Sequence, residues 1–164
     1  MKNTSVVLGI LIVSVVLVVG GVYLAYRSTP GVAVTPTTGA VAGVGNNRYD
    51  WGEIGINNGV VEAVFDIKNE GSEPLQLTRV QTSCMCTMAQ LTRGEEVSPE
   101  FGMHDNSSYM MTVSAGEAVK LTVRFDPAFH GPNGVGPITR QVSVQTNDSK
   151  RPELTYQLTA TVVK

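Results

Sequence analysis

The chain has 164 residues, with 12 Lys and Arg against 14 Asp and Glu, a formal net charge of −2. All the acidic residues, and all the basic ones except Lys2 and Arg27, lie from residue 48 onward, so the C-terminal part is mildly acidic. Such a balance argues against a nucleic-acid-binding protein and against docking on anionic lipid through a basic surface. The length allows one domain once the N-terminal segment is set apart.

The first segment in chain order is an uncharged apolar run. Residues 5–26 read SVVLGILIVSVVLVVGGVYLAY. A helix that rises about 1.5 Å per residue over this run is long enough to cross a hydrocarbon core of about 30 Å. The run exceeds the apolar region of about 7–15 residues found in cleavable signal peptides, and no small-x-small cleavage site follows it. We therefore predict an uncleaved signal-anchor, a transmembrane helix, over residues 1–27.

A linker is predicted between this helix and the rest of the chain. Residues 28–47 are uncharged, rich in Gly, Thr, Val and Pro, and show neither helical nor strand periodicity, as in a flexible spacer.

The orientation of the predicted helix in the membrane is not set by charge alone. Lys2 and Arg27 flank the apolar run, so the positive-inside rule is nearly balanced. A short N-terminal tail followed by a β-rich domain favours an extracytoplasmic C-terminal domain.

The remaining residues, 48–164, follow an all-β pattern. Apolar and polar residues alternate in short segments, at 61–68, 75–80, 119–125, 142–144 and 154–162. Turn sequences separate them, such as NNG at 57–59 and EGSEP at 70–74. No long amphipathic helix competes with this pattern. Strands of this length and spacing predict a β-sandwich.

Several motifs occur in order along the predicted domain: YDWGEI at 49–54, FDIKNEG at 65–71, EPL at 73–75, SCMCT at 83–87, GE at 116–117, FDP at 125–127 and TND at 146–148. Together they resemble a bacterial domain-of-unknown-function family, immunoglobulin-like (Ig-like) and related to hydin-type and major-sperm-protein-type sandwiches. The resemblance covers nearly all of residues 49–163. It implies a seven- or eight-stranded Ig-like sandwich on the outer side of a bacterial cell membrane, with no established catalytic activity. The family pattern has Gly between the two cysteines, where this chain has Met85.

The two cysteines of the chain, Cys84 and Cys86, are separated by one residue. We expect this pair to lie on a strand, whose extended backbone would project both cysteine side chains from one face and Met85 from the other. Three interpretations stay open: packing as small hydrophobes or as a strained disulfide, a metal-binding pair, and a redox-exchange pair. A C-x-C sequence lacks the C-x-x-C helix-start context that lowers a thiol pKa. The predicted core is large enough to fold without a disulfide.

A set of soft ligands surrounds this pair in the sequence. Beyond Met1, every methionine lies between residues 85 and 111, and both histidines fall in loops that depart from the short form of the family. Thiolate, thioether and imidazole groups select copper or zinc. The candidate metal ligands are Cys84, Cys86, Met103, His104 and His130. Two cysteines and two histidines suit tetrahedral zinc, whereas an added thioether favours copper.

The spacing of these ligands matches no standard metal motif. His130 is also suited to capping a turn, and Met110 and Met111 to packing in a loop. Hydrolytic signatures such as a nucleophile elbow, a phosphate loop or HExxH are absent, so we expect no enzymatic activity. We predict a membrane-anchored extracytoplasmic Ig-like module that binds a soft metal, with copper favoured over zinc. The alternative is a structural or adhesive module that binds another cell-envelope protein and holds no metal.

Overall fold

The computed structural model describes residues 2–27 and 34–164, and within the N-terminal helix it describes side chains for residues 7–23. The chain divides into two units, the helix and a β domain, which are treated separately below. The predicted linker begins with residues 28–33, which lie outside the described residues.

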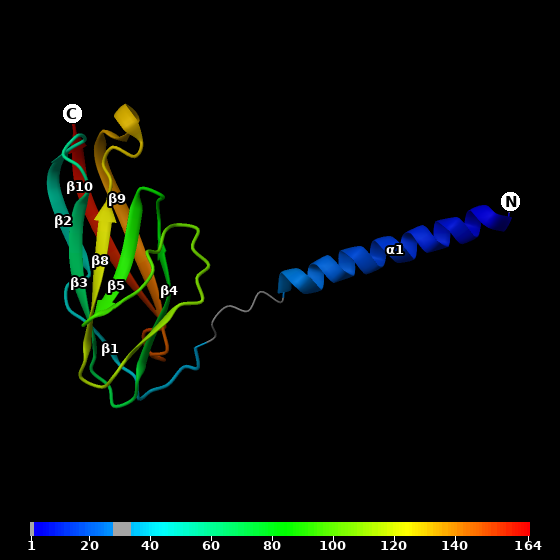
Figure 1. The fold of residues 1–164 in the computed structure, drawn as a ribbon, viewed down its shortest axis with the longest axis horizontal. Coiled ribbons are helices and arrows are strands. Elements are labelled where there is room, and N and C mark those ends of the chain that lie inside the picture. The colour runs from blue at the N-terminus through cyan, green and yellow to red at the C-terminus, as the bar shows by residue number, and fades with distance from the viewer. Residues whose placement is uncertain (1, 28–33) are drawn as a thin grey trace. The chain divides into compact units, whose positions relative to one another are not determined.

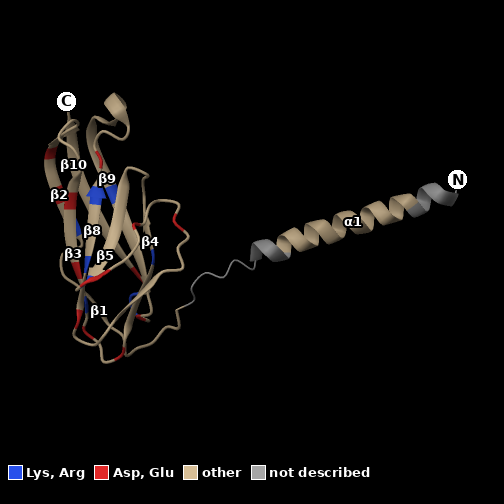
Figure 2. Ribbon diagram, viewed as in Figure 1, with Lys and Arg blue, Asp and Glu red and all other residues tan. Residues whose placement is uncertain are grey.

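Helix α1 (Lys2–Arg27) forms where the apolar run predicts it. Its large apolar side chains from Val7 to Tyr23 are exposed, and Figure 2 shows no charged residue along its described part. Over the part of the chain that the structure describes, no helix combines the length and the apolar character that crossing a bilayer requires. This finding does not support the predicted transmembrane span.

Two five-stranded sheets pack face to face in the β domain (Figure 1). One sheet has the order β1 (Ala42–Val44), β3 (Val61–Asn69), β8 (Ala118–Phe125), β5 (Thr87–Arg93), β6 (Glu96–Val97). The other has the order β2 (Arg48–Gly55), β10 (Glu153–Val163), β9 (Gly136–Thr146), β4 (Leu75–Thr82), β7 (Met110–Val113). Strands β2 and β10 pair in parallel, whereas the other neighbours pair antiparallel. The predicted β-sandwich is confirmed.

The alternation of apolar and polar residues in the sequence places apolar side chains on the buried face of each sheet and polar ones on the exposed face. In β3, Ala63, Phe65 and Ile67 are buried, while the residues between them face solvent. Phe65 lies opposite Leu121 of β8, which is fully buried at the centre of the same sheet. The inward faces of both sheets supply the core because successive strand residues point to opposite sides.

The sandwich begins earlier in the chain than residue 48. Ala42–Val44 form strand β1 against β3, and the side chains of Ala40 and Ala42 are completely buried. Part of the predicted flexible linker is therefore structured. A three-residue edge strand is too short to show a period of two, which explains why the sequence pattern missed it.

The cysteine stretch is not an extended strand, so that expectation is wrong. Strand β4 ends at Thr82 and β5 begins at Thr87, in the other sheet. Between them the Thr87 N–H donates to the Cys84 carbonyl at 3.1 Å and closes a turn. The Thr82 hydroxyl oxygen lies 3.0 Å from that carbonyl oxygen and 2.9 Å from the carbonyl oxygen of Thr87. The two cysteines thus lie in a tight connection between the sheets.

The segment after β6 is partly core rather than a plain loop. Phe101 is 2% exposed and forms an antiparallel bridge with Ala89. Met111, expected to pack in a loop, is fully buried within strand β7. Met110 of the same strand is only partly buried.

Candidate functional site

The register of β5 and β8 brings two distant connections together. Thr87 at the start of β5 pairs with Phe125 at the end of β8, and the Asp126 N–H donates to the Cys86 carbonyl at 3.0 Å. The chain that enters β5 carries both cysteines, and the chain that leaves β8 carries His130. The two connections therefore meet at one end of the sandwich, the end that also bears the short 3-10 helix Gly131–Gly134 (Figure 1).

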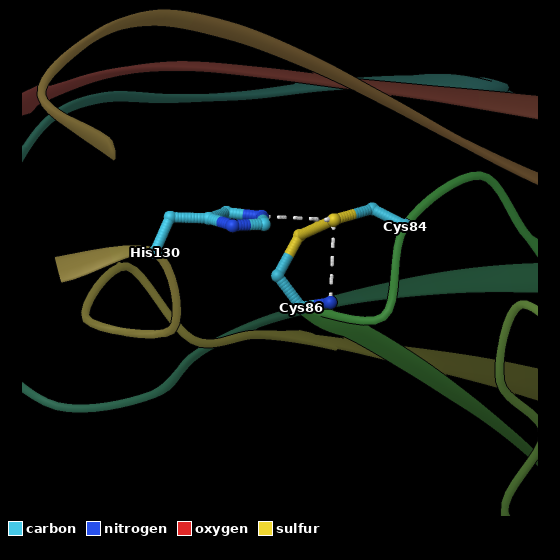
Figure 3. A group of neighbouring side chains, drawn as sticks. All are labelled: Cys84, Cys86 and His130. Atoms are coloured by element: carbon cyan, nitrogen blue, oxygen red, sulfur yellow. Dashed lines mark hydrogen bonds between the residues drawn. A yellow bond between two sulfur atoms is a disulfide. The ribbon is translucent and has the colours of Figure 1, made fainter. Parts of the chain in front are cut away.

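Cys84 and Cys86 are joined by a disulfide (Figure 3). Cys86 is 3% exposed, whereas Cys84 is only half-buried. Both belong to an apolar cluster at this end of the domain, whose buried members are Ile54, Cys86, Phe125, Ala160 and Val162. The two sulfur atoms are thus unequally shielded from solvent.

His130 points its imidazole at the disulfide (Figure 3). Its Nε2 atom lies 3.4 Å from the Cys84 Sγ, and the Cys86 N–H also donates to that sulfur, at 3.2 Å. The ligand atoms of Cys84, Cys86 and His130 all lie within 4.8 Å of one another. With the disulfide reduced, these three residues have the donor set of a soft-metal site.

Arg140 of β9 contacts the other sulfur. Its Nε donates to the Cys86 Sγ at 3.1 Å, and its guanidinium carbon lies 5.5 Å from the centroid of the Phe125 ring. Burial lowers the pKa of Arg140, but a guanidinium stays charged under ordinary conditions. Cys86 also has the Thr87 hydroxyl 3.6 Å from its sulfur.

Sequence reasoning missed Arg140, although a signal for it exists. Arg140 shares its strand face with Ile138 and the buried Val142. A charged residue at an inward position of an alternating strand needs a polar partner. The Arg140 guanidinium donates to the carbonyl oxygen of Thr139 at 2.8 Å and to the Cys86 sulfur, in a connection between the two sheets, at 3.1 Å.

Met103 and His104 lie in the segment between β6 and β7. Both side chains are exposed, and His104 does not belong to the group formed by Cys84, Cys86 and His130. Their segment runs beside the end of β4, where the Thr82 N–H donates to the Gly102 carbonyl at 3.3 Å. Of the four predicted Cys and His ligands, the structure therefore gathers three within 4.8 Å of one another.

An apolar groove lies beside the disulfide. Its lining includes Val60, Met85, Met88 and Phe129, together with Cys86. Met85 is 58% exposed and Phe129 47%. Exposed apolar side chains in one groove are a feature of surfaces that bind other molecules.

Comparison with known proteins agrees with this architecture. A family model described as a protein of unknown function (DUF1573) matches residues 43–103, which include the cysteine stretch. The resemblance noted in the sequence, to a family of unknown function, is thereby supported over these residues. A search of curated proteins found no match.

Many solved structures are similar to this chain, among them the following three. A Porphyromonas gingivalis W83 protein of unknown function has 20% identity and a TM-score of 0.59, over 82% of this chain and 51% of its own. The chain thus spans about half the length of that protein, and the likeness shows the fold. An ASH/PapD-like domain of human CEP192 has 14% identity and a TM-score of 0.48, over 83% of this chain and 93% of its own. The C. elegans MSP family member WR4 has 12% identity and a TM-score of 0.42, over 74% of this chain and 97% of its own.

Proposed function

We propose that this protein is a membrane-tethered module that binds one soft metal ion through Cys84, Cys86 and His130 when its disulfide is reduced. The observation that carries the proposal is the convergence of their three ligand atoms within 4.8 Å. Two thiolates and one imidazole are ligands that Cu(I) and Zn(II) both accept.

The redox state of the cysteines controls this binding. A thiolate is the metal ligand, and a sulfur held in the Cys84–Cys86 disulfide is not a thiolate. Metal therefore enters only after an external reductant has opened the disulfide. The oxidised form is the state without metal.

Copper suits the group better than zinc. Structural zinc sites almost always take four protein ligands, and three are gathered here. For zinc, a fourth ligand would have to come from solvent or from a residue outside this group, such as Met103 or His104. Soft thiolates select Cu(I) without that requirement.

The tether is part of the same proposal. The uncharged run 5–26 and the exposed apolar side chains of α1 support attachment to a bacterial cell membrane. A domain outside the cytoplasm suits a protein with a disulfide, because disulfides persist in oxidising compartments. Alkaline washing of membranes should leave the full chain in the pellet and release a chain that lacks residues 1–27.

Metal binding is tested with the full-length chain, purified in detergent and reduced under anaerobic conditions. Cu(I) is titrated against a chromophoric chelator, and Zn(II) in a parallel experiment. We expect one equivalent of Cu(I) to be retained, a loss of retention in the double variant C84S/C86S, and at least tenfold weaker binding in H130A. H104A is the matched histidine control, with unchanged Cu(I) affinity. Equally weak retention by the wild type and the double variant would overturn the proposal.

A second candidate function rests on the apolar groove beside the disulfide. The exposed side chains of Val60, Met85 and Phe129 favour contact with another protein of the cell envelope. Replacement of Met85 and Phe129 by Ser should abolish capture of such a partner by cross-linking in whole cells. Unchanged cross-links in this variant would count against the groove as the contact surface.

A further inference from the structure

We infer that the Cys84–Cys86 disulfide undergoes thiol–disulfide exchange with an external dithiol, with Cys84 as the sulfur attacked and Cys86 as the leaving sulfur. This activity uses the same residues as the proposed metal site but does not depend on metal binding. It follows from three observations: the unequal exposure of the two cysteines, the charge beside one sulfur, and the position of the pair at an exposed end of the fold.

The sulfur of Cys84 is the one that an external thiolate can reach. An incoming thiolate must reach the sulfur that it attacks, so the exchange rate depends on exposure. Cys84 is half-buried, while Cys86 is 3% exposed and packs in the apolar cluster with Phe125 and Val162. The connection that holds the pair lies outside both sheets, so opening the disulfide breaks no strand pairing.

The neighbours of Cys86 stabilise it as a leaving group. When the disulfide opens at Cys84, negative charge develops on the Cys86 sulfur. The Arg140 Nε already donates to that atom at 3.1 Å, and the Thr87 hydroxyl lies 3.6 Å away. A charged donor in a partly buried site stabilises a thiolate more strongly than a neutral donor does. Within residues 34–164, the sulfur of Cys84 contacts the backbone N–H of Cys86 and the His130 imidazole, and no guanidinium.

The exchange takes place in two steps. In the first, a partner thiolate forms a bond to the Cys84 Sγ, the Cys84–Cys86 bond breaks, and its electron pair stays on Cys86. In the second, the other thiolate of the partner attacks the partner's own sulfur in the mixed disulfide and releases Cys84. The partner dithiol is oxidised to a disulfide and this protein is reduced. The two protons lost by the partner's thiols pass to the two cysteines or to solvent.

The test uses the full-length chain in detergent with EDTA present, so that metal binding plays no part. The variants C86S and C84S are made in an R140Q background, so that no guanidinium activates Cys86; each keeps one thiol, and oxidised glutathione is the probe. Mass spectrometry follows the formation of the glutathione mixed disulfide over time. We expect C86S, which keeps Cys84, to react at least tenfold faster than C84S. Equal rates, or a faster reaction of C84S, would overturn the assignment of Cys84.

A second measurement tests the role of Arg140. The wild-type disulfide is reduced with dithiothreitol, and the rate is compared with that of R140Q, R140K and the surface control R48Q, with circular dichroism reporting the fold. We expect R140Q to slow reduction at least fivefold, R140K to recover part of the rate and R48Q to match the wild type. Equal rates for R140Q and the wild type would contradict the leaving-group role. Failure of the folded wild type to be reduced by millimolar dithiothreitol would overturn the exchange activity itself.

Discussion

The carboxylate of Asp148 accepts a hydrogen bond from the backbone N–H of Ala42, 106 residues earlier in the chain, at 3.0 Å. The Arg151 guanidinium donates to the carbonyl of the same Ala42 at 2.7 Å, so both backbone groups of this residue are held by one turn. Asp148 is 3% exposed and also accepts from the Lys150 N–H. This turn, between β9 and β10, therefore anchors strand β1 to the sandwich.

Acid should weaken the domain through Asp148. Burial raises the pKa of this carboxyl, but the backbone N–H groups of Ala42, Lys150 and Arg151 and the Arg151 charge outweigh burial and hold the pKa below its usual 3.8. A depressed pKa means that the stabilisation is present above pH 3.8 and is lost as pH falls through the folded value. We expect D148N to lower the free energy of unfolding by about 1–3 kcal/mol at pH 7.

Urea unfolding of the wild type and D148N between pH 7 and pH 3 checks this. The difference between their free energies of unfolding should shrink below about pH 4. Both chains share the other carboxyl groups, so the effect of their titration on the free energy of unfolding drops out of this difference. A difference that stays constant down to pH 3 would refute the assignment.

The centre of the sandwich should be sensitive to lost volume. Leu121 is completely buried on β8, the middle strand of its sheet. Leu121→Ala should cost about 2–5 kcal/mol in the free energy of unfolding, because the site cannot fully collapse around the cavity. The control Val64→Ala, on neighbouring β3, removes a side chain that is 50% exposed and should cost well under half as much. Comparable losses in the two variants, by thermal or urea unfolding, would contradict the described core.

The turn after β3 should tolerate no side chain at Gly71. A Cβ at this position would overlap the carbonyl oxygen of Gly39, which accepts from the N–H groups of Ser72 and Glu73. Gly71→Ala should therefore destabilise the domain, by about 1–3 kcal/mol. Gly45→Ala is the matched control, since open space surrounds that position and its backbone is not left-handed. Urea unfolding measures this. A midpoint of unfolding for Gly71→Ala equal to that of Gly45→Ala would show that Gly71 does not pack against Gly39 as described.

Metal should stabilise the reduced domain but not the oxidised one. A ligand that binds only the folded state at 100 times its dissociation constant adds about 2.7 kcal/mol. We expect Cu(I) to raise the unfolding midpoint of the reduced chain and to leave that of the disulfide-bonded chain unchanged. Scanning calorimetry of both forms, with C84S/C86S as the control, measures this. A rise of equal size in the oxidised chain or in the double variant would place the metal elsewhere.

Local sequence patterns were sufficient to predict most strands of the sandwich. Strands β3 and β8 follow from alternation, because a strand with one buried face needs an apolar residue at every second position. The same reasoning missed β1, which has too few residues to alternate. It also placed the cysteines in a strand, although Cys84 and Cys86 lie in the turn between β4 and β5.

The residue types of the candidate site were visible in the sequence, but their grouping was not. Cysteine pairing, soft ligands and the location of His130 in a loop could all be recognised there. Cys84 and His130 are 46 positions apart and Cys86 and Arg140 are 54 apart, and the sequence between them contains no local signal of contact. Only the tertiary structure shows that His130 and Arg140 contact the cysteines and that His104 is not part of their group. The reason is physical: these contacts depend on the long-range register of β5 against β8 and on the packing of the two sheets.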